Sequence, residues 1–573
     1  MNLFTIFLVK NRFQIVLLFV MVNVTIYAQN NKQFLRLNGM ISLSYDNYSS
    51  NVKNYNLFRN RYPADLFRLN ANATLYFGKY FSIPFGINFS NQEKTFNLPT
   101  LPEEGVYNYI RNPRNNFHFD PTYKWIHTTF GSHTPQYSEF TSGDMQIFGM
   151  GVDINPGKFI FSANYGTSQY AVEPNPSLRI PGAYEQKIMG ARIGIGKLKG
   201  SKFTLNLVKV SDDVHSLKQN PIGIKPKEGI SFAPMLEVDF TKNIKLKSEF
   251  AASVFTEDLL AKNSLGNEFD FDKISKIITI NNSSHLDYAH INNISWHSKN
   301  IGVGVEVKYI GPGFMSVGYR NIEKDIIDYK LLTDFKLFKN KFILNGSVGL
   351  RTNNISGTKL DKNKRVIGNV NLLAQFTKKF SLNFSYSNFG FRNNRKENMY
   401  RIEMVSNSFS LTPTYQIANK NRMQQLSLTT SFDQFTQYDA YTQSFLETTS
   451  KMLQTNYLIS FNKSSFHFAL FALYMENSSD LLSIKMENAG LNLGYYFFKK
   501  KLKTNLYTTF TRMERPGFTP DDRLNFRLKM RYKLAKKTDF DISFSQYNNR
   551  YGSYRPGAEI QENKLQVMLT QKF

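Results

Sequence analysis

The chain has 573 residues, no cysteine, 15% aromatic residues and a formal net charge of +27. Its mean hydropathy of −0.38 excludes a bundle of membrane helices, but it suits a β-barrel in which alternate residues face water. The lack of cysteine excludes a lipid-anchored lipoprotein and a fold held together by disulfides.

The first 28 residues differ from the rest of the chain. Lys10 and Arg12 precede an apolar run that extends from Ile15 to Val22, and a small residue, Ala28, ends the segment. This order is typical of a secretory signal peptide, so we expect cleavage after residue 28 and a mature barrel over residues 29–573. No other stretch approaches eighteen apolar residues, so no transmembrane helix is expected.

Alternation of apolar and polar residues begins at Phe34, and it recurs on both sides of twelve short polar or basic breaks. Successive side chains of a strand lie on opposite faces, so this alternation predicts strands joined by tight turns. The breaks follow one another at intervals of 36 to 57 residues, near Gly78, Asp120, Gly157, Lys199, Lys242, Lys299, Asn340, Lys378, Lys420, Lys463, Lys500 and Lys536.

Twelve breaks imply twelve strand pairs after them and one pair before Gly78, which makes 26 strands, with 24 as the lower bound. We therefore predict an all-β fold, a single large transmembrane antiparallel up-and-down β-barrel. A propeller or a hairpin array has a similar period, but the alternation and the signal peptide favour the membrane. Longer polar connections alternate with the tight ones, as expected for extracellular loops opposite short periplasmic turns; they span residues 92–106, 211–229, 256–285 and 392–399.

Two local features refine the strand prediction. In the sequence Asn155-Pro-Gly-Lys158, proline at the second turn position and glycine at the third favour a type II turn. Prolines inside predicted strands fit less well and predict a bulge or a break in the ladder; they are Pro84, Pro234 and Pro413.

The strand expected over residues 523–534 alternates apolar with polar residues throughout. Its polar face carries Arg523, Arg527, Lys529, Arg531 and Lys533. In a barrel this face lines the lumen, where the cations would attract anionic solutes. The alternative is pairing across strands: with Leu534 opposite Phe540, Lys533 falls opposite Asp541. The mature chain keeps a charge of +25 after Lys10 and Arg12 are removed, and much of it lies in turns that could touch anionic lipid headgroups.

The last ten residues place an apolar face on a final strand that ends in an aromatic residue. This face carries Leu565, Val567, Leu569 and Phe573, and Gln571 interrupts it. The pattern resembles the insertion signal of outer-membrane proteins, which implies that the barrel-assembly machinery binds the strand by adding it to its own open edge. The alternative is an ordinary closing strand that ends at phenylalanine.

Several segments look like those of poorly characterised outer-membrane β-barrel proteins of Bacteroidota. They are the start at Gln29, the stretch Asp120-Pro-Thr-Tyr-Lys-Trp125, the hairpin Asn155-Pro-Gly-Lys-Phe159 and the segment Arg365-Val-Ile-Gly-Asn369. The resemblance spans most of the mature chain and implies the location and the barrel fold. It implies no activity and no catalytic residues.

Few residues indicate a chemical site. His285, Asp287 and His290 form one local cluster, but it lies in an expected loop without a further closely spaced ligand, so we expect no metal. The acids Glu257, Asp258, Glu268, Asp270 and Asp272 do not have the spacing of a calcium loop. No P-loop, dinucleotide fingerprint or nucleophile elbow occurs, so we predict no cofactor and no enzyme activity. The basic residues belong to turns and strand faces, so we predict no nucleic-acid partner.

Function therefore has to come from the architecture. A barrel of about 26 strands has a wider lumen than a sixteen- to eighteen-stranded porin, so something should fill or gate it. In-folded loops, a flattened barrel packed with side chains and a separate plug protein are the options. Because strand pattern starts at Phe34, we expect no N-terminal plug domain, which argues against an ordinary TonB-dependent receptor.

Three functions follow from this argument. The leading hypothesis is a transport or export conduit in outer-membrane lipid, gated by loops or plugged by a partner such as a surface lipoprotein. The alternative is a non-conducting barrel that anchors or assembles cell-surface proteins. An outer-membrane hydrolase comes third, because no serine, histidine and acid set is recognisable in the sequence.

Overall fold

A computed structural model describes the strands and most of the connections between them. It covers residues 34–90, 110–111, 115–143, 145–176, 180–219, 223–262, 276–316, 322–358, 362, 364–392, 403–439, 444–461, 464–479 and 482–573. The expected signal peptide, residues 1–28, lies outside these ranges.

The described chain is built almost entirely of strands. In order they are β1 (Leu35–Lys53), β2 (Asp65–Phe77), β3 (Phe81–Ser90), β4 (His118–Phe119), β5 (Thr122–Tyr123), β6 (Ile126–His133), β7 (Ile147–Ile154), β8 (Phe159–Gln169), β9 (Glu185–Gly196), β10 (Lys202–Asp213), β11 (Glu228–Asp239), β12 (Ile244–Thr256), β13 (Ser284–His297), β14 (Ile301–Ile310), β15 (Ile326–Leu337), β16 (Phe342–Asn353), β17 (Lys364–Gln375), β18 (Phe380–Arg392), β19 (Glu403–Ala418), β20 (Arg422–Asp439), β21 (Ser444–Phe461), β22 (Phe466–Ser479), β23 (Ser483–Phe497), β24 (Leu502–Arg515), β25 (Phe518–Ala535), β26 (Thr538–Arg550) and β27 (Glu559–Lys572). No helix among the described residues is long and apolar enough to cross a bilayer.

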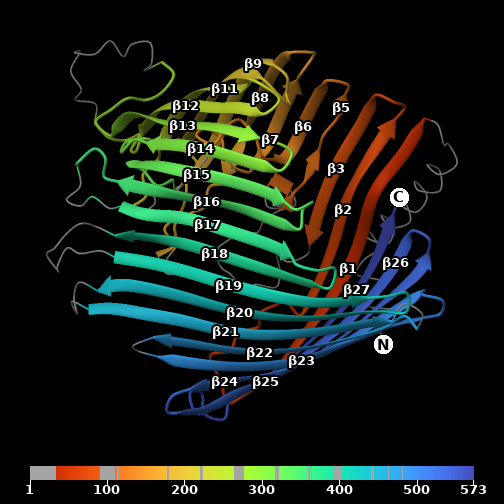
Figure 1. The fold of residues 1–573 in the computed structure, drawn as a ribbon. Coiled ribbons are helices and arrows are strands. Elements are labelled where there is room, and N and C mark those ends of the chain that lie inside the picture. Colours follow the sequence, from red (N-terminus) through yellow and green to blue (C-terminus); the bar gives the residue numbers. More distant parts are fainter. Residues whose placement is uncertain are drawn as a thin grey trace.

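Antiparallel pairing runs from each strand to the next and closes on itself (Figure 1). β1 pairs with β27 along a ladder that runs from Met40 opposite Lys572 to Lys53 opposite Glu559. The short strands β4 and β5 share one position, because both pair with β3 on one side and β6 on the other. The sheet is therefore a closed barrel with 26 strand positions, which confirms the predicted fold and count.

Eleven of the twelve predicted breaks fall between consecutive strands of the barrel, although Lys463 itself lies outside the described residues. The break at Asp120 is wrong, because Asp120 and Pro121 only interrupt one strand position, between β4 and β5. The tight turn itself lies a few residues later, where Lys124 takes a positive φ of 51° and Tyr123 pairs with Ile126. A proline and a polar break in the sequence do not distinguish a turn from a gap within a strand.

The predicted turn at Gly157 is present in a shifted form. Gly157 has a φ of 66°, as a tight turn requires. However, the hydrogen bond joins the amide of Phe159 to the carbonyl of Pro156 at 3.1 Å, so Gly157 occupies the second turn position and not the third.

All three prolines lie inside strands, beside interruptions of the ladder, as predicted. The β11–β12 ladder skips from Phe232 to Met235, around Pro234, and the β19–β20 ladder skips from Leu411 to Thr414, around Pro413. Pro84 of β3 lies beside the gap between β4 and β5, where its carbonyl accepts a hydrogen bond of 2.8 Å from the amide of Asp120. Neither skipped ladder changes register, so these are local breaks without a bulge.

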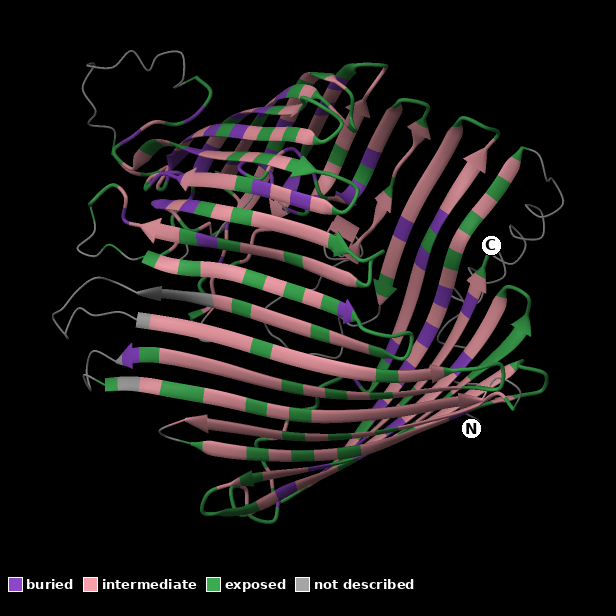
Figure 2. Cartoon of the chain, viewed as in Figure 1, coloured by how far each residue is buried: buried purple, intermediate pink, exposed green. Residues whose placement is uncertain are grey.

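Exposed residues recur along the strands between less exposed ones (Figure 2), and the register places the two sets on opposite faces of the barrel wall. Large apolar side chains that remain exposed lie on the outer face, for example Leu207, Phe232, Phe250, Val305, Leu331, Val348, Leu470 and Leu524. Small or polar side chains on the lumen face are buried, for example Ser44, Asp46, Asn206, Ser231, Ser253, Thr509, Asp541 and Glu562. This arrangement is that of a transmembrane barrel, whose outer face meets lipid and whose inner face meets water.

Candidate functional site in the lumen

The connection between β6 and β7, residues 134–146, folds into the lumen, and we call it the inturned loop; position 144 is not described. Phe140 of this loop is 0% exposed. It packs against alanines on the lumen face of three neighbouring strands, Ala233, Ala251 and Ala289. These small side chains leave room for the aromatic ring, so the wall and the loop are complementary in shape.

Tyr137 anchors the inturned loop at a second point, through apolar packing and one hydrogen bond. Tyr137 is 5% exposed and packs among Ile147, Ile188 and Val208 on the lumen face. Burial raises the pKa of Tyr137 to about 12, so its hydroxyl is neutral, and it accepts a hydrogen bond from Asn164. The loop is therefore held by apolar packing at both Tyr137 and Phe140.

Polar groups of the wall satisfy the backbone of the loop. The amide of Phe140 donates to the Glu249 carboxylate at 3.0 Å, and Glu249 itself is 1% exposed. Arg192 donates to the carbonyl of Gln136, and its guanidinium lies 4.9 Å from the centre of the Tyr137 ring. Backbone groups removed from water need such partners, because an unpaired one costs about 1–3 kcal/mol.

A second connection, residues 311–325 between β14 and β15, folds over the same part of the wall; it is described at 311–316 and 322–325. Phe314 is fully buried, and its ring meets Phe140 edge-on with centroids 5.7 Å apart. The hydroxyl of Ser316 donates to the carbonyl of Thr141 at 3.3 Å, and the amide of Gly313 donates to Asp287 at 2.7 Å. The two connections thus pack on each other inside the barrel.

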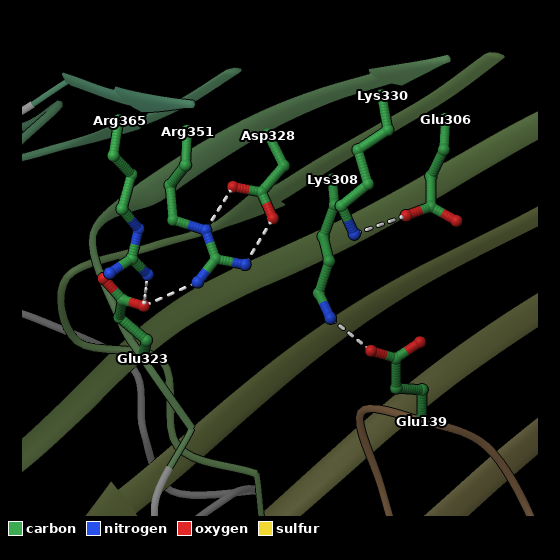
Figure 3. A network of polar contacts seen from close by, with 8 residues as sticks. All are labelled: Glu139, Glu306, Lys308, Glu323, Asp328, Lys330, Arg351 and Arg365. Atoms are coloured by element: carbon green, nitrogen blue, oxygen red, sulfur yellow. Dashed lines mark hydrogen bonds and ion pairs between the residues drawn. The ribbon is translucent and has the colours of Figure 1, made fainter. Parts of the chain in front are cut away.

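A row of ion pairs crosses the wall beside these loops (Figure 3). Arg351 of β16 holds Asp328 of β15 with two hydrogen bonds of 2.5 and 2.6 Å, and Asp328 is 0% exposed. Arg351 also contacts Glu323 at 2.6 Å. Lys330 pairs with Glu306 at 3.1 Å. The network includes four acids and four bases, the other members being Glu139, Lys308 and Arg365.

The loops supply two of the four acids in this network. Glu139 of the inturned loop pairs with Lys308 of β14, and Glu323 of the second connection pairs with Arg365 of β17 at 2.5 Å (Figure 3). The network therefore carries no formal net charge, and each loop is tied to the wall by a cation of a strand.

The predicted cationic row lies on the lumen face of β25. Of its five members, Arg531 alone has an ion pair among the described residues, with Asp541 at 2.7 Å. Arg527 donates to the hydroxyls of Ser545 and Tyr547 at 3.1 and 3.0 Å. The pairing of β25 with β24 and β26 places the remaining members on the same face; they are Arg523, Lys529 and Lys533.

The predicted pairing of Lys533 with Asp541 is wrong by two residues. Lys533 lies opposite Asp539, and Asp541 lies opposite Arg531. A slip of two residues keeps every side chain on its face, so alternation in the sequence does not fix the register.

The final strand closes the barrel and presents its predicted apolar residues outward. Leu565, Val567 and Leu569 lie on the outer face of β27, paired with β1 and β26. The amide of Phe573 donates to the carbonyl of Gly39 at 2.9 Å. On the lumen side of the same seam, Asp46 is 4% exposed and pairs with Arg68 at 2.9 Å and Lys564 at 3.4 Å.

The histidine cluster lies on a strand and not in the expected loop. His285 and Asp287 point to the lumen from β13, whereas His290 lies on the outer face, stacked on Tyr309 with centroids 5.4 Å apart. No group of three metal-ligating side chains occurs among the described residues. Of the acids considered for calcium, Asp258 pairs with Lys225 at 3.0 Å, while Glu268, Asp270 and Asp272 lie outside the described residues. The hydrogen bond from Lys225 lowers the pKa of Asp258.

Sequence reasoning gave in-folded loops as one option but did not identify which connections fold inward. Two features of the sequence could have identified these connections. The connection at 134–146 contains Tyr137, Phe140 and Met145, which is more apolar than a solvated loop requires. The lumen faces of β11, β12 and β13 carry Ala233, Ala251 and Ala289 side by side, flanked by Asn206 of β10 and Ile310 of β14.

Comparisons with known proteins add little to these observations. No family model matches the chain, and no curated protein matches it. Among solved structures, it is similar to OccAB4 of Acinetobacter baumannii, with 12% identity over 65% of this chain and 98% of that one and a TM-score of 0.27.

Two other structures cover more of the chain. The translocation pore of the P pilus usher PapC is 11% identical, covers 93% of this chain and 99% of its own, and has a TM-score of 0.36. BauA, the ferric preacinetobactin receptor of Acinetobacter baumannii, is 9% identical over 93% of this chain and 80% of that one, with a TM-score of 0.37. Similarity this low establishes neither ancestry nor activity, so the fold assignment rests on the strand pairings themselves.

Proposed function

We propose that the chain is an outer-membrane conduit for small polar solutes whose lumen is narrowed by its own inturned loop. The observation that carries this proposal is the fully buried Phe140, which packs inside the barrel against lumen-facing alanines of β11, β12 and β13. A barrel of this size needs an internal obstruction if the membrane is to remain a barrier. The inturned loop and the 311–325 connection supply one.

The polar lumen face supports passage of polar solutes. On one wall the charges of the β14–β17 network balance, and on the β25 wall the cations outnumber their paired acids. A lumen with this imbalance favours anions, because its field raises their local concentration.

The location and assembly are part of the same proposal. An apolar outer face, a closed sheet and the expected signal peptide support insertion into an outer membrane. The outward residues of the last strand, Leu565, Val567 and Leu569, with the terminal Phe573, support recognition by the barrel-assembly machinery.

The test is permeation by the purified mature protein. In planar bilayers we expect discrete conductance steps with anion preference, and in proteoliposomes we expect swelling with small polar solutes. A silent barrel that copurifies with a surface lipoprotein would contradict the conduit and support the anchoring alternative instead.

A further inference from the structure

A hollow of about 590 Å³ lies in the lumen wall formed by β23, β24, β25 and β26. Its lining includes Asn492 of β23, Asn505 and Tyr507 of β24, and Arg527 and Lys529 of β25. These positions lie in the middle of their strands, so the hollow opens at mid-height in the barrel. It is separate from the inturned loop, which packs on β11–β13.

The wall beside the hollow carries a prepared aromatic surface. Phe471 of β22 lies nearly parallel to Tyr507, with centroids 5.8 Å apart and 11° between the ring planes. Gly490 makes this arrangement possible, because a Cβ there would lie 2.2 Å from Cε1 of Phe471. Tyr507 is 36% exposed although it faces the lumen. Aromatic rings on a polar lumen wall offer a flat contact for the C–H face of a ring-shaped solute.

The same hollow concentrates side-chain amides with unused bonding capacity. The Oδ1 atoms of Asn488 and Asn492 are buried and have no hydrogen-bond partner among the described residues, so a rotation of these side chains would bring an unpaired oxygen to a ligand. Asn525 and Asn505 line the hollow as well, and Asn505 bonds to His467 at 3.0 Å. An amide offers two donors and an acceptor, which suits a ligand with many hydroxyls.

The charge of the hollow is positive. Arg527 bonds only to the neutral hydroxyls of Ser545 and Tyr547, and Lys529 has no ion pair among the described residues. No carboxylate belongs to the described lining. A ligand that carries a carboxylate would supply the missing counter-charge, through charge-assisted hydrogen bonds that are about twice as strong as neutral ones.

We propose that this hollow binds an acidic oligosaccharide, whose sugar rings lie on Tyr507, supported from beside by Phe471, while its hydroxyls meet the asparagine amides and its carboxylates meet Arg527 and Lys529. An inorganic anion would use the two cations but not the rings. A neutral sugar would use the rings and amides but not the cations. That acidic oligosaccharides are substrates of the protein rests on the proposed conduit. That the hollow binds them does not depend on it.

The test is titration calorimetry of the mature protein in detergent micelles, with trigalacturonate as the probe and maltotriose, AMP and inorganic phosphate as comparators. We expect trigalacturonate to bind more tightly than each comparator and to weaken as salt rises. The double change Arg527→Gln with Lys529→Gln should weaken trigalacturonate by about tenfold or more and leave maltotriose unchanged. Tyr507→Ala should weaken both sugars.

Matched controls lie on the same strand face, outside the hollow. Arg523→Gln and Lys533→Gln remove the same charge, and we expect neither to change the affinity for trigalacturonate by more than about twofold. The proposal would be overturned if trigalacturonate gave no heat of binding, or if AMP or phosphate bound as tightly. It would also be overturned if the control variants lost as much affinity for trigalacturonate as the double variant. Because the titration needs no conduction, its failure is distinguishable from failure of the conduit in planar bilayers.

Discussion

The backbone amide of Phe140 donates a hydrogen bond of 3.0 Å to the carboxylate of Glu249, although the two residues lie 109 positions apart in the chain. Glu249 is 1% exposed and projects from the lumen face of β12. The bond thus joins the middle of the inturned loop to the barrel wall. Loss of the acceptor would leave a buried amide unpaired, whereas loss of the charge alone would not.

Substitution at Glu249 should therefore separate these two effects. We expect Glu249→Ala to loosen the inturned loop by about 1–3 kcal/mol, because the Phe140 amide loses its acceptor. Glu249→Gln keeps an acceptor oxygen of the same reach, so the loop should stay in place. Hydrogen exchange of the peptide spanning residues 135–143 measures this directly. If this peptide exchanged in the Glu249→Ala variant at the wild-type rate, the hydrogen bond would not be what holds the loop.

Phe140 contributes the apolar part of the same anchor. We expect Phe140→Ala to cost the seated loop about 3–5 kcal/mol, the usual range for loss of a buried ring. Because Phe314 contacts Phe140, the double change with Phe314→Ala should cost less than the sum of the single changes. The readout is the rate at which added protease cleaves the loop in proteoliposomes. Phe250→Ala, on the outer face of β12, is the control, and equal cleavage in Phe250→Ala and Phe140→Ala would refute the packing argument.

Glu323 neutralises Arg351 and Arg365 at the side of the lumen (Figure 3). We expect Glu323→Gln to raise the permeability of anions relative to cations, because it leaves two guanidinium groups less compensated. Reversal potentials in a salt gradient measure the ratio. Glu559→Gln on the outer face should not alter it, and an unchanged ratio in both variants would mean that this network does not border the path of the ions.

The seam between β1 and β27 contains a buried ion pair and an exposed one. The side chain of Asp46, 4% exposed, pairs with Lys564 at 3.4 Å, whereas the side chain of Lys53, 66% exposed, pairs with Glu559 at 3.4 Å. We expect Asp46→Asn to cost about 1–3 kcal/mol, since it removes a buried carboxylate that pairs with the partly exposed Arg68 and Lys564, and Lys53→Gln to cost at most about 1 kcal/mol. The temperature at which the folded band disappears from a detergent gel reports both. Equal shifts would argue against a special role of Asp46 in closure.

The sequence predicted the parts of this fold that depend on local alternation. The strands, their faces, the closed barrel and eleven of the twelve turns follow from a period of two, because that period is a property of each segment alone. The ladder breaks at Pro234 and Pro413 follow in the same way, since proline has no amide to donate.

Features that depend on contacts between distant segments were not predicted. The register that places Arg531 opposite Asp541 differs from the predicted one by two residues, a slip that leaves the pattern of faces unchanged. Phe140 is buried against Ala233 and Ala251, which lie about a hundred residues away in the chain, so no local sequence pattern predicts this contact. For the same reason, the hollow beside Tyr507 did not emerge from the cationic row alone.

Single-channel recording of a variant that lacks residues 135–143 tests the central claim most directly, because these residues are most of the inturned loop. A gel shift on heating should first show that the barrel still closes, as its strands and its β1–β27 seam are intact. We expect the variant to conduct severalfold more than the wild-type protein, with longer open times. Conductance equal to that of the wild type, or silence in both proteins, would contradict a lumen narrowed by this loop.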